Sequence, residues 1–380
     1  MNNFESCQYS IDELDAFRDE NGFIDLNKVG VTLSAASRVI IGNINRVKNW
    51  VDFAGKKALI KGEAKLENER NYGIYAELIV EELAKKLGIP SAHYDLIKII
   101  DEEGKEVFGV LSESMLEKPE AETLRSLQSI IGNEPEEDEI FPDVTNLYFT
   151  LDTLSDKLYD EGYDEDQIEK ILTEYQKRLM FGVLTVDTDK HTQNIAFIEK
   201  IENGRHTIDI SPNFDSESAF LLDMDKSTLD TLISDYEGLK RAVDLAEPRI
   251  GVYTLREDGG YESLWKDSLV ELCEDDYIRE YYDELKSKGF GDMEEVLNAV
   301  EERIHAPLPE EVRLIAKYSH QIRVKEMQKI VKSRQKVQSK IQNPYSIESI
   351  LGTFLSKGND IRSSEMAEIE GKMARDILRI

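Results

Sequence analysis

The chain has 380 residues, of which 40% are hydrophobic, and a formal net charge of -30 at pH 7. This composition can fill one large or two medium domains, and it excludes a globally disordered chain. The acidity argues against a general nucleic-acid binder and against binding to anionic membrane surfaces, because both need Lys and Arg. With no secretory signal and no apolar run long enough to span a membrane, we expect a cytoplasmic protein.

The N-terminal part of the chain predicts strands followed by a helix. Residues 10–13 form a capping-box pattern that predicts a short helix, and the β-branched stretch 38–45 predicts a strand. Residues 49–53 and 58–61 flank a glycine-containing turn, which is the pattern of a β-hairpin. This hairpin places Lys61 at the end of a strand.

The next segment has the apolar spacing of a helix over residues 72–87, with Gly88 as its stop signal. Glu77 lies in the middle of this helix. Residues 94–100 and 107–115 then predict two further strands. We therefore expect a small mixed α/β lobe over residues 1–117.

Helical patterns dominate the rest of the chain, and one long apolar face runs through residues 168–183. Directly after it, the loop D-K-H-T-Q-N has the form D-x-H-x-x-N. Residues 195–198 and 206–210 predict a second hairpin, and Asp215 follows it. From about residue 226 the chain again has helical patterns. The expected fold class is α+β, a two-lobed protein-kinase-like fold with a mainly helical lobe over residues 118–380.

Five side chains offer the parts of a phosphotransfer site, and in chain order they are Lys61, Glu77, Asp189, Asn194 and Asp215. Phosphoryl transfer needs a metal that bridges phosphate oxygens, a cation that neutralises phosphate charge and a carboxylate near the incoming hydroxyl. Magnesium prefers carboxylate, amide and water oxygens. Asp189 is placed to orient or deprotonate a hydroxyl, and the second hairpin brings Asp215 back towards Asn194. Lys61 is placed to reach phosphates, held by Glu77 through a charge-assisted hydrogen bond.

Other candidate groups are less informative. His191 is better interpreted as a side chain that holds the loop than as a metal ligand, since no second histidine has ligand spacing. Asp187, two residues before Asp189, is either a group that supports the site from behind its direct ligands or an ordinary loop acid, and the second interpretation is preferred. The sequence has no G-x-x-x-x-G-K-[ST] and no G-x-S-x-G motif. A phosphate-covering loop would have to come from residues 30–45, with Ser34, Ser37 and Gly42 as candidates.

The basic segment 317–340 stands out in so acidic a chain, with eight Lys or Arg residues and one acid, Glu326. Two interpretations remain open. In the first, the segment is a helix whose basic side chains face solvent or pack against the protein's own acidic residues. In the second, it is a docking surface for an acidic partner or a nucleic acid.

With these residues assembled, the chain resembles the HipA-like serine/threonine kinases, as a compact variant. The resemblance is carried by residues 71–94, with their L-G-I-P-S-A-H-Y ending, by the D-K-H-T-Q-N loop and by S-P-N-F-D at 211–215. It implies ATP and Mg²⁺ as cofactors. It also implies roles for individual residues: Asp189 as catalytic base, Asn194 and Asp215 as magnesium ligands, Lys61 as the phosphate lysine, and Met115 and Leu116 in the hinge that contacts adenine.

The resemblance further implies a protein hydroxyl as substrate and, for a toxin of a toxin–antitoxin system, a DNA-binding antitoxin as partner. Direct nucleic-acid binding by this chain is not expected. Two alternatives stay open. Phosphoinositide kinases carry a D-R-H-x-x-N loop, so a lipid or small-molecule kinase is the first. A kinase fold without activity that binds a partner is the second.

Overall fold

The computed structural model describes residues 5–32, 38–41, 44–63, 72–101, 104–132, 147–202, 205–247, 253–255, 261–263 and 265–341. The chain forms two compact units, residues 1–327 and 328–380. Ser34, Ser37 and Gly42 lie outside the described residues, and so does the acidic sequence E-P-E-E-D-E at 134–139. Within the described part, the structure contains no helix with the length and apolar character needed to cross a membrane.

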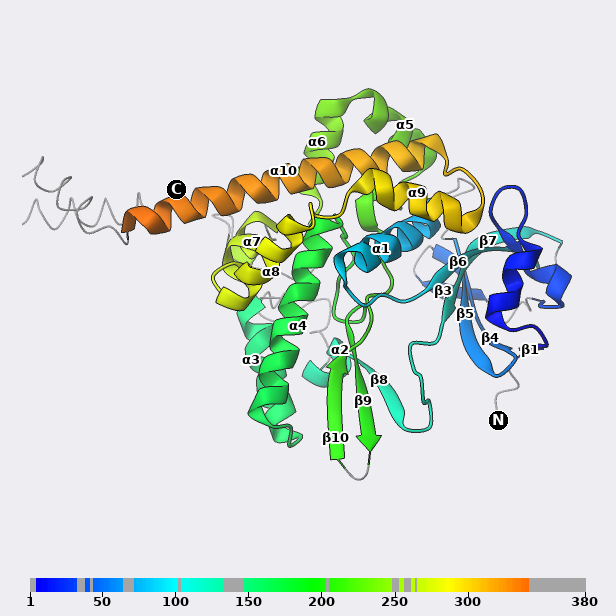
Figure 1. Ribbon diagram of the computed structural model, residues 1–380, viewed down its shortest axis with the longest axis horizontal. Coiled ribbons are helices and arrows are strands. Elements are labelled where there is room, and N and C mark those ends of the chain that lie inside the picture. The colour runs from blue at the N-terminus through cyan, green and yellow to red at the C-terminus, as the bar shows by residue number, and fades with distance from the viewer. Residues whose placement is uncertain are drawn as a thin grey trace, which may run out of the picture. The chain divides into compact units, whose positions relative to one another are not determined.

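A seven-stranded mixed sheet forms the N-terminal part of the first unit, in the order β1-β4-β5-β7-β6-β2, with β3 paired to β4 (Figure 1). The strands are β1 (Glu5–Cys7), β2 (Ile24–Asp25), β3 (Arg38–Ile41), β4 (Ile44–Phe53), β5 (Lys56–Gly62), β6 (Tyr94–Ile100) and β7 (Glu106–Glu113). The predicted hairpin is confirmed, since β4 and β5 pair antiparallel around a turn at Ala54 and Gly55. The strand predicted over 38–45 divides between β3 and β4.

The first 35 residues contribute more to the sheet than the sequence predicts. β1 pairs in parallel with β4, and β2 pairs in parallel with β6, so this polar segment supplies both edges of the sheet. The expected short helix is a 3₁₀ helix, η1 (Ile11–Phe17), with the Ser10–Glu13 capping box formed. A second one, η2 (Leu26–Val29), follows β2. Partners this distant in sequence leave no local signal, which is why the pattern does not predict these edges.

Helix α1 (Gly73–Leu87) packs against β6 and against α9 (Met293–Ile304). The prediction of a helix over residues 72–87 is confirmed. It ends where Gly88 adopts a left-handed conformation (φ 79°), which a residue without Cβ reaches at no steric cost. Most of α1 is buried, including Glu77, because both the sheet and α9 cover the helix.

The segment after β7 builds a second, three-stranded antiparallel sheet in the order β10-β9-β8. Its elements are β8 (Glu122–Ser126), α2 (Leu127–Ile131), α3 (Leu147–Asp160), α4 (Glu165–Leu184), β9 (Ala196–Glu202) and β10 (Arg205–Ile210). The predicted hairpin after the long helix is confirmed as β9 and β10. The third strand, β8, has no strand pattern of its own in the sequence, because only its pairing with β9 makes it a strand.

The remaining elements are mostly helical, as predicted: η5 (Ala219–Leu221), α5 (Lys226–Ser234), α6 (Tyr236–Leu245), β11 (Tyr253–Leu255), β12 (Tyr261–Ser263), α7 (Trp265–Leu272), α8 (Asp276–Ser287), α9 and α10 (Glu310–Ile341). The short β11–β12 hairpin is the exception. The architecture confirms the predicted α+β class. The predicted lobe boundary at residue 117 falls inside the first unit and stays a prediction.

The basic segment 317–340 lies on α10, where part of its charge is used within the first unit. Lys317 Nζ lies 2.9 Å from Glu294 Oε2 on α9. Arg323 is buried, stacks 3.9 Å from the centroid of the Trp265 ring, and donates to the carbonyl oxygens of Val243 and Ala246. These contacts favour the interpretation of a helix that packs against its own protein.

Candidate active site

Lys61 lies on β5, directly opposite Val110 of β7, and it is buried. A lysine is rarely buried unless it is paired, and this one is: its Nζ lies 2.9 Å from Glu77 Oε1 on α1 and 3.0 Å from Glu217 Oε2, and it also contacts Asp215 Oδ1. The predicted Lys61–Glu77 pair is therefore present. The sequence did not point to Glu217.

Gly109 of β7 permits the close approach of β5 and β7 at Lys61. A Cβ on Gly109 would meet the carbonyl oxygen of Lys61 and would lie 2.8 Å from Gly62 Cα, and backbone atoms cannot move aside as a flexible side chain can. We expect Gly109→Ala to lower the free energy of unfolding by about 1–3 kcal/mol through this overpacking. Urea denaturation measures the effect. An unchanged midpoint would show that β5 and β7 do not need this contact.

The four side chains of this cluster carry three carboxylates and one ammonium group. Oxygens of Glu77, Asp215 and Glu217 all lie within 4.8 Å of one another, a spacing at which they could hold a metal ion. Burial raises the pKa of Glu77, the charge of Lys61 opposes this, and Asp215 and Glu217 raise it further. If all four groups are ionised, the cluster has an excess of two negative charges, which a divalent cation would neutralise. The donor set therefore fits magnesium.

Asp215 is held in an unusual backbone conformation, with φ 53°. Non-glycine residues in this left-handed region are uncommon, and such residues concentrate at functional sites. Its N–H donates to Tyr94 Oη at 3.1 Å, and the N–H of Ser216 donates to Glu77 Oε2 at 2.8 Å. The backbone of Asp215 is thus held through the peptide groups on both sides of the residue.

The L-G-I-P-S-A-H-Y segment reaches the S-P-N-F-D segment through backbone pairing. Asn213 N–H donates to the Pro90 carbonyl, and Ala92 N–H donates to the Asn213 carbonyl, both at 2.8 Å. The buried guanidinium of Arg178 on α4 bonds both strands of this pairing, at Pro90 O (3.4 Å) and Ser211 O (2.7 Å). This pairing explains why two motifs separated by about 120 residues belong to one site.

The D-K-H-T-Q-N loop follows the end of α4. Asn194 Nδ2 donates to the Asp189 carbonyl at 2.8 Å and lies 3.3 Å from Asp189 Oδ2, so its amide oxygen is the atom suited to a metal. His191 Nδ1 accepts from the N–H of Gln193 at 3.1 Å. His191 is therefore a loop support, as expected. The Asp189 side chain is about one-third exposed (32%), which leaves it accessible to a substrate hydroxyl.

Lys190 links this loop to the Asp215 segment, a role that the sequence did not indicate. Its side chain is buried, and Nζ donates to the Phe214 carbonyl at 2.9 Å and to Ser216 Oγ at 3.0 Å. It also lies 3.1 Å from Asp187 Oδ2. The interpretation of Asp187 as an ordinary loop acid was wrong: its side chain is fully buried, and its Oδ1 accepts from the N–H of Asp189 at 3.1 Å.

Asp223 adds a further acidic group to this region. Burial raises the pKa of Asp223 to about 6, and the charges of Glu217 and Asp187 act in the same direction. The neighbourhood of Lys61 and Lys190 is thus rich in carboxylates, as a site for a metal–phosphate complex would be.

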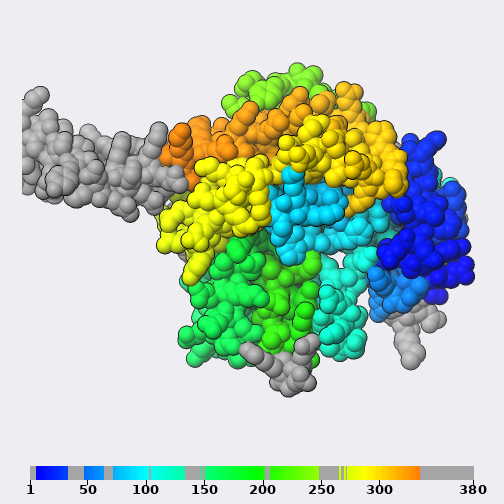
Figure 2. Space-filling view, viewed as in Figure 1, coloured from blue at the N-terminus to red at the C-terminus, as the bar shows by residue number. Residues whose placement is uncertain are grey.

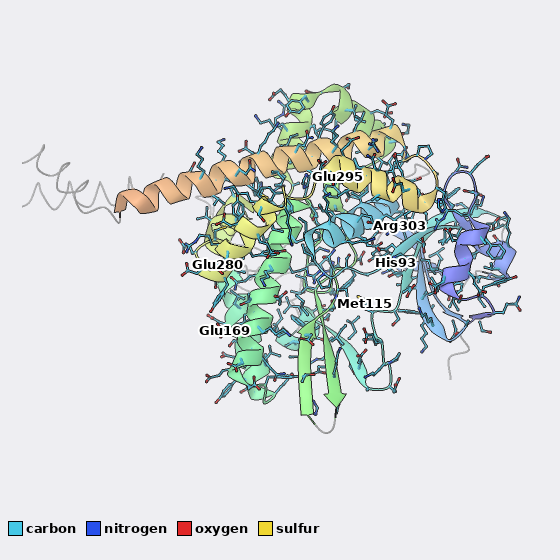
Figure 3. The ribbon with its side chains drawn as sticks, viewed as in Figure 1. His93, Met115, Glu169, Glu280, Glu295 and Arg303 are labelled. Atoms are coloured by element: carbon cyan, nitrogen blue, oxygen red, sulfur yellow. The ribbon has the colours of Figure 1, made fainter. Side chains whose placement is uncertain are left out.

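A charged network surrounds the start of β6, next to Tyr94 (Figure 3). Arg303 of α9 donates to the Tyr94 carbonyl at 3.0 Å and lies 2.9 Å from Glu81 Oε2. His93 Nδ1 lies 2.7 Å from Glu81 Oε1, and its Nε2 lies 3.4 Å from Asp95 Oδ2. Hydrogen bonds with Asp95 and with Glu81 raise the pKa of His93 to about 10.

This pKa predicts how stability depends on pH. An unfolded histidine has a pKa of about 6.5, so the protonated His93 contributes its full stabilisation below that pH and loses it as the pH rises towards about 10. The side chain is 43% exposed, so solvent screening limits the effect to about 1 kcal/mol or less. Urea denaturation should show wild type losing more stability than His93→Gln between about pH 6 and about pH 9. Equal losses would contradict the assignment.

Met115 and Leu116 lie on the connection between β7 and β8, where the hinge was predicted; Met115 is labelled in Figure 3. Both are half-buried, and the N–H of Leu116 is 3.3 Å from Ser114 Oγ. Their contact with adenine stays a prediction. The roles of Asn194 and Asp215 as a pair of metal ligands also stay a prediction.

No family model and no curated protein matches this sequence. The fold, however, is similar to that of the Helicobacter pylori proinflammatory kinase CtkA, with a TM-score of 0.57 and 14% identity over 81% of this chain and 100% of that one. The predicted kinase-like fold is thereby confirmed. HipA of Shewanella oneidensis MR-1, solved with HipB and operator DNA, is also matched, with a TM-score of 0.43 and 15% identity over 77% of this chain and 65% of that one.

Proposed function

We propose that this protein is a HipA-like kinase that transfers a phosphoryl group from ATP to a serine or threonine hydroxyl of a protein, with Mg²⁺. The observation that carries the proposal is the cluster around Lys61. It joins a strand lysine, a helix glutamate and the aspartate that follows the second hairpin, in a chain with the fold of a kinase. Lys190 ties the Asp189 loop to the same segment.

Each residue has a role in the proposed reaction. When bound, Mg²⁺-ATP supplies the phosphoryl group and the metal charge on its oxygens. Asn194 and Asp215 would hold the metal, Lys61 would contact the phosphates, and Glu77 would keep Lys61 in place. Asp189 would accept the proton of the attacking hydroxyl while the bond to the leaving phosphate oxygen breaks. Met115 and Leu116 would contact adenine.

The substrate class is tested by incubating the protein with γ-labelled ATP, magnesium and cell lysate, and by separating labelled proteins, lipids and small molecules. The proposal expects label on serine or threonine of a protein, appearing at least about 100-fold more slowly with Asp189→Asn. Label in the lipid or small-molecule fraction would favour the alternative of a lipid or small-molecule kinase. Label independent of Asp189 would contradict the proposal.

An antitoxin is the proposed partner, and the protein is proposed to be the toxin of such a pair in the cytoplasm. The support is the resemblance of its sequence motifs to those of the HipA-like kinases, which include toxins paired with a DNA-binding antitoxin. Co-purification from the native host tests this. A stable complex with a DNA-binding protein is expected, and a chain that purifies alone would contradict it.

A further inference from the structure

A second surface feature lies away from the Lys61 cluster, along helices α3 and α4 and the start of α8. These helices pack side by side (Figure 1), and a groove of about 520 Å³ runs between them. Its lining residues on α4 belong to the N-terminal part of that helix, from Glu165 to Gln176. Gln176, the lining residue nearest the end of α4, precedes that end by eight residues, or roughly 12 Å of helix. The groove is therefore separate from the candidate active site.

The groove has an apolar floor and exposed aromatic side chains. Ile168 and Leu172 are one helical turn apart, so they share a face of α4, and Ile168 is buried. Tyr159 of α3 is 67% exposed and Tyr277 of α8 is 59% exposed; among the large hydrophobic residues of the described chain, only Leu245 is more exposed. Large aromatic residues with a polar end, held at a concave surface, are characteristic of binding sites.

The charge of the groove is of one sign. Four carboxylates line it, those of Asp156, Glu165, Glu169 and Asp275, and none of the described lining residues is basic. Two of them have a structural role. Asp275 caps α8 by accepting from the N–H of Tyr277 at 2.8 Å, and Glu165 lies in the first turn of α4.

Asp156 and Glu169 have no such role. Both are exposed, and neither forms an ion pair within the part of the chain that the structure describes. Figure 3 labels Glu169 on α4, and Figure 2 shows the green surface of α3 and α4 open to solvent on the face drawn.

We propose that this groove is a docking site for a basic amphipathic segment of a protein partner. An apolar or aromatic side chain of the partner would lie on Ile168 and Leu172 between the two tyrosines, and lysines or arginines beside it would meet the four carboxylates. The negative charge of the groove favours a basic partner. It repels nucleic acid, whose phosphates are negative, and it disfavours an acidic peptide.

A fluorescein-labelled amphipathic peptide of Lys and Leu tests the proposal by fluorescence anisotropy, beside the same peptide with Glu in place of Lys. We expect wild type to bind the basic peptide alone. The double variant D156N/E169Q should bind it about tenfold more weakly, a loss of about 1.4 kcal/mol. Tyr277→Ser should also weaken it. Asp189→Asn should bind as wild type does, so this result stands whether or not the protein is a kinase.

The matched control is the double variant E237Q/E302Q, which removes the same charge from exposed positions on α6 and α9. It should bind the basic peptide as wild type does. Equal weakening in both double variants would show mere attraction to an acidic protein and would overturn the proposal, as would the absence of binding to wild type. A dimer in sedimentation that D156N/E169Q dissociates would identify a second copy as occupant and would also overturn it.

Discussion

Replacing Asp189 by asparagine should lower the rate of phosphoryl transfer by about 10²- to 10⁴-fold, the usual contribution of a positioned general base. The substitution preserves the size of the side chain and removes its negative charge and its ability to take up a proton. Asp189 lies beside, and not within, the cluster of carboxylates around Lys61, so the affinity for ATP should change little. Steady-state kinetics should therefore show a fall in kcat with a nearly unchanged KM.

A matched substitution on the surface separates this effect from general damage. Asp209→Asn removes an exposed carboxylate of β10 that pairs with Lys170, and it should leave kcat unchanged. If Asp189→Asn were as active as Asp209→Asn, Asp189 would not be the base.

Lys190→Met should be the most destabilising of the substitutions considered. The change leaves the buried carboxylate of Asp187 without its cation, and breaking a buried ion pair in this way costs about 3–5 kcal/mol. It also removes the hydrogen bonds to Phe214 and Ser216, so the Asp215 segment should lose its tie to the Asp189 loop. Urea denaturation measures the loss of stability.

Two further variants make this prediction specific. Lys177→Met removes a half-buried lysine of α4 whose partner is Glu174 and should cost less than about 1 kcal/mol. The double variant D187N/K190M should recover at least about 1 kcal/mol relative to the sum of its single substitutions, because no buried charge is then left unpaired. Additive losses would show that Asp187 and Lys190 do not act as a pair.

The sequence predicted the parts of the site that follow from local patterns. The strands and helices concerned have period-2 or period-3.6 patterns, and turn residues separate them. These parts are the β4–β5 hairpin, helix α1, the loop at the end of α4 and the β9–β10 hairpin. The approach of Asp215 to the site could be anticipated because a hairpin reverses the direction of the chain. The residues that follow its second strand therefore lie near those that precede its first strand.

The parts that the sequence did not predict depend on tertiary partners. Glu217 and Lys190 look like ordinary surface charges in the sequence, and only their positions beside Lys61 and Asp187 give them a role. Nothing in the sequence around Gly109 indicates that the backbone of β5 packs against this residue. Glu217 offered one weak signal, its position two residues after Asp215, where the chain already turns back towards the lysine.

Binding of Mg²⁺-ATP, measured by isothermal titration calorimetry, tests most directly whether the Lys61 cluster is a nucleotide site. We predict that wild type binds one Mg²⁺-ATP, and that Lys61→Met and Asp215→Asn each weaken binding by at least about tenfold. Asp189→Asn should bind as wild type does. No binding to wild type, or binding that Lys61→Met and Asp215→Asn leave unchanged, would contradict the assignment of this cluster.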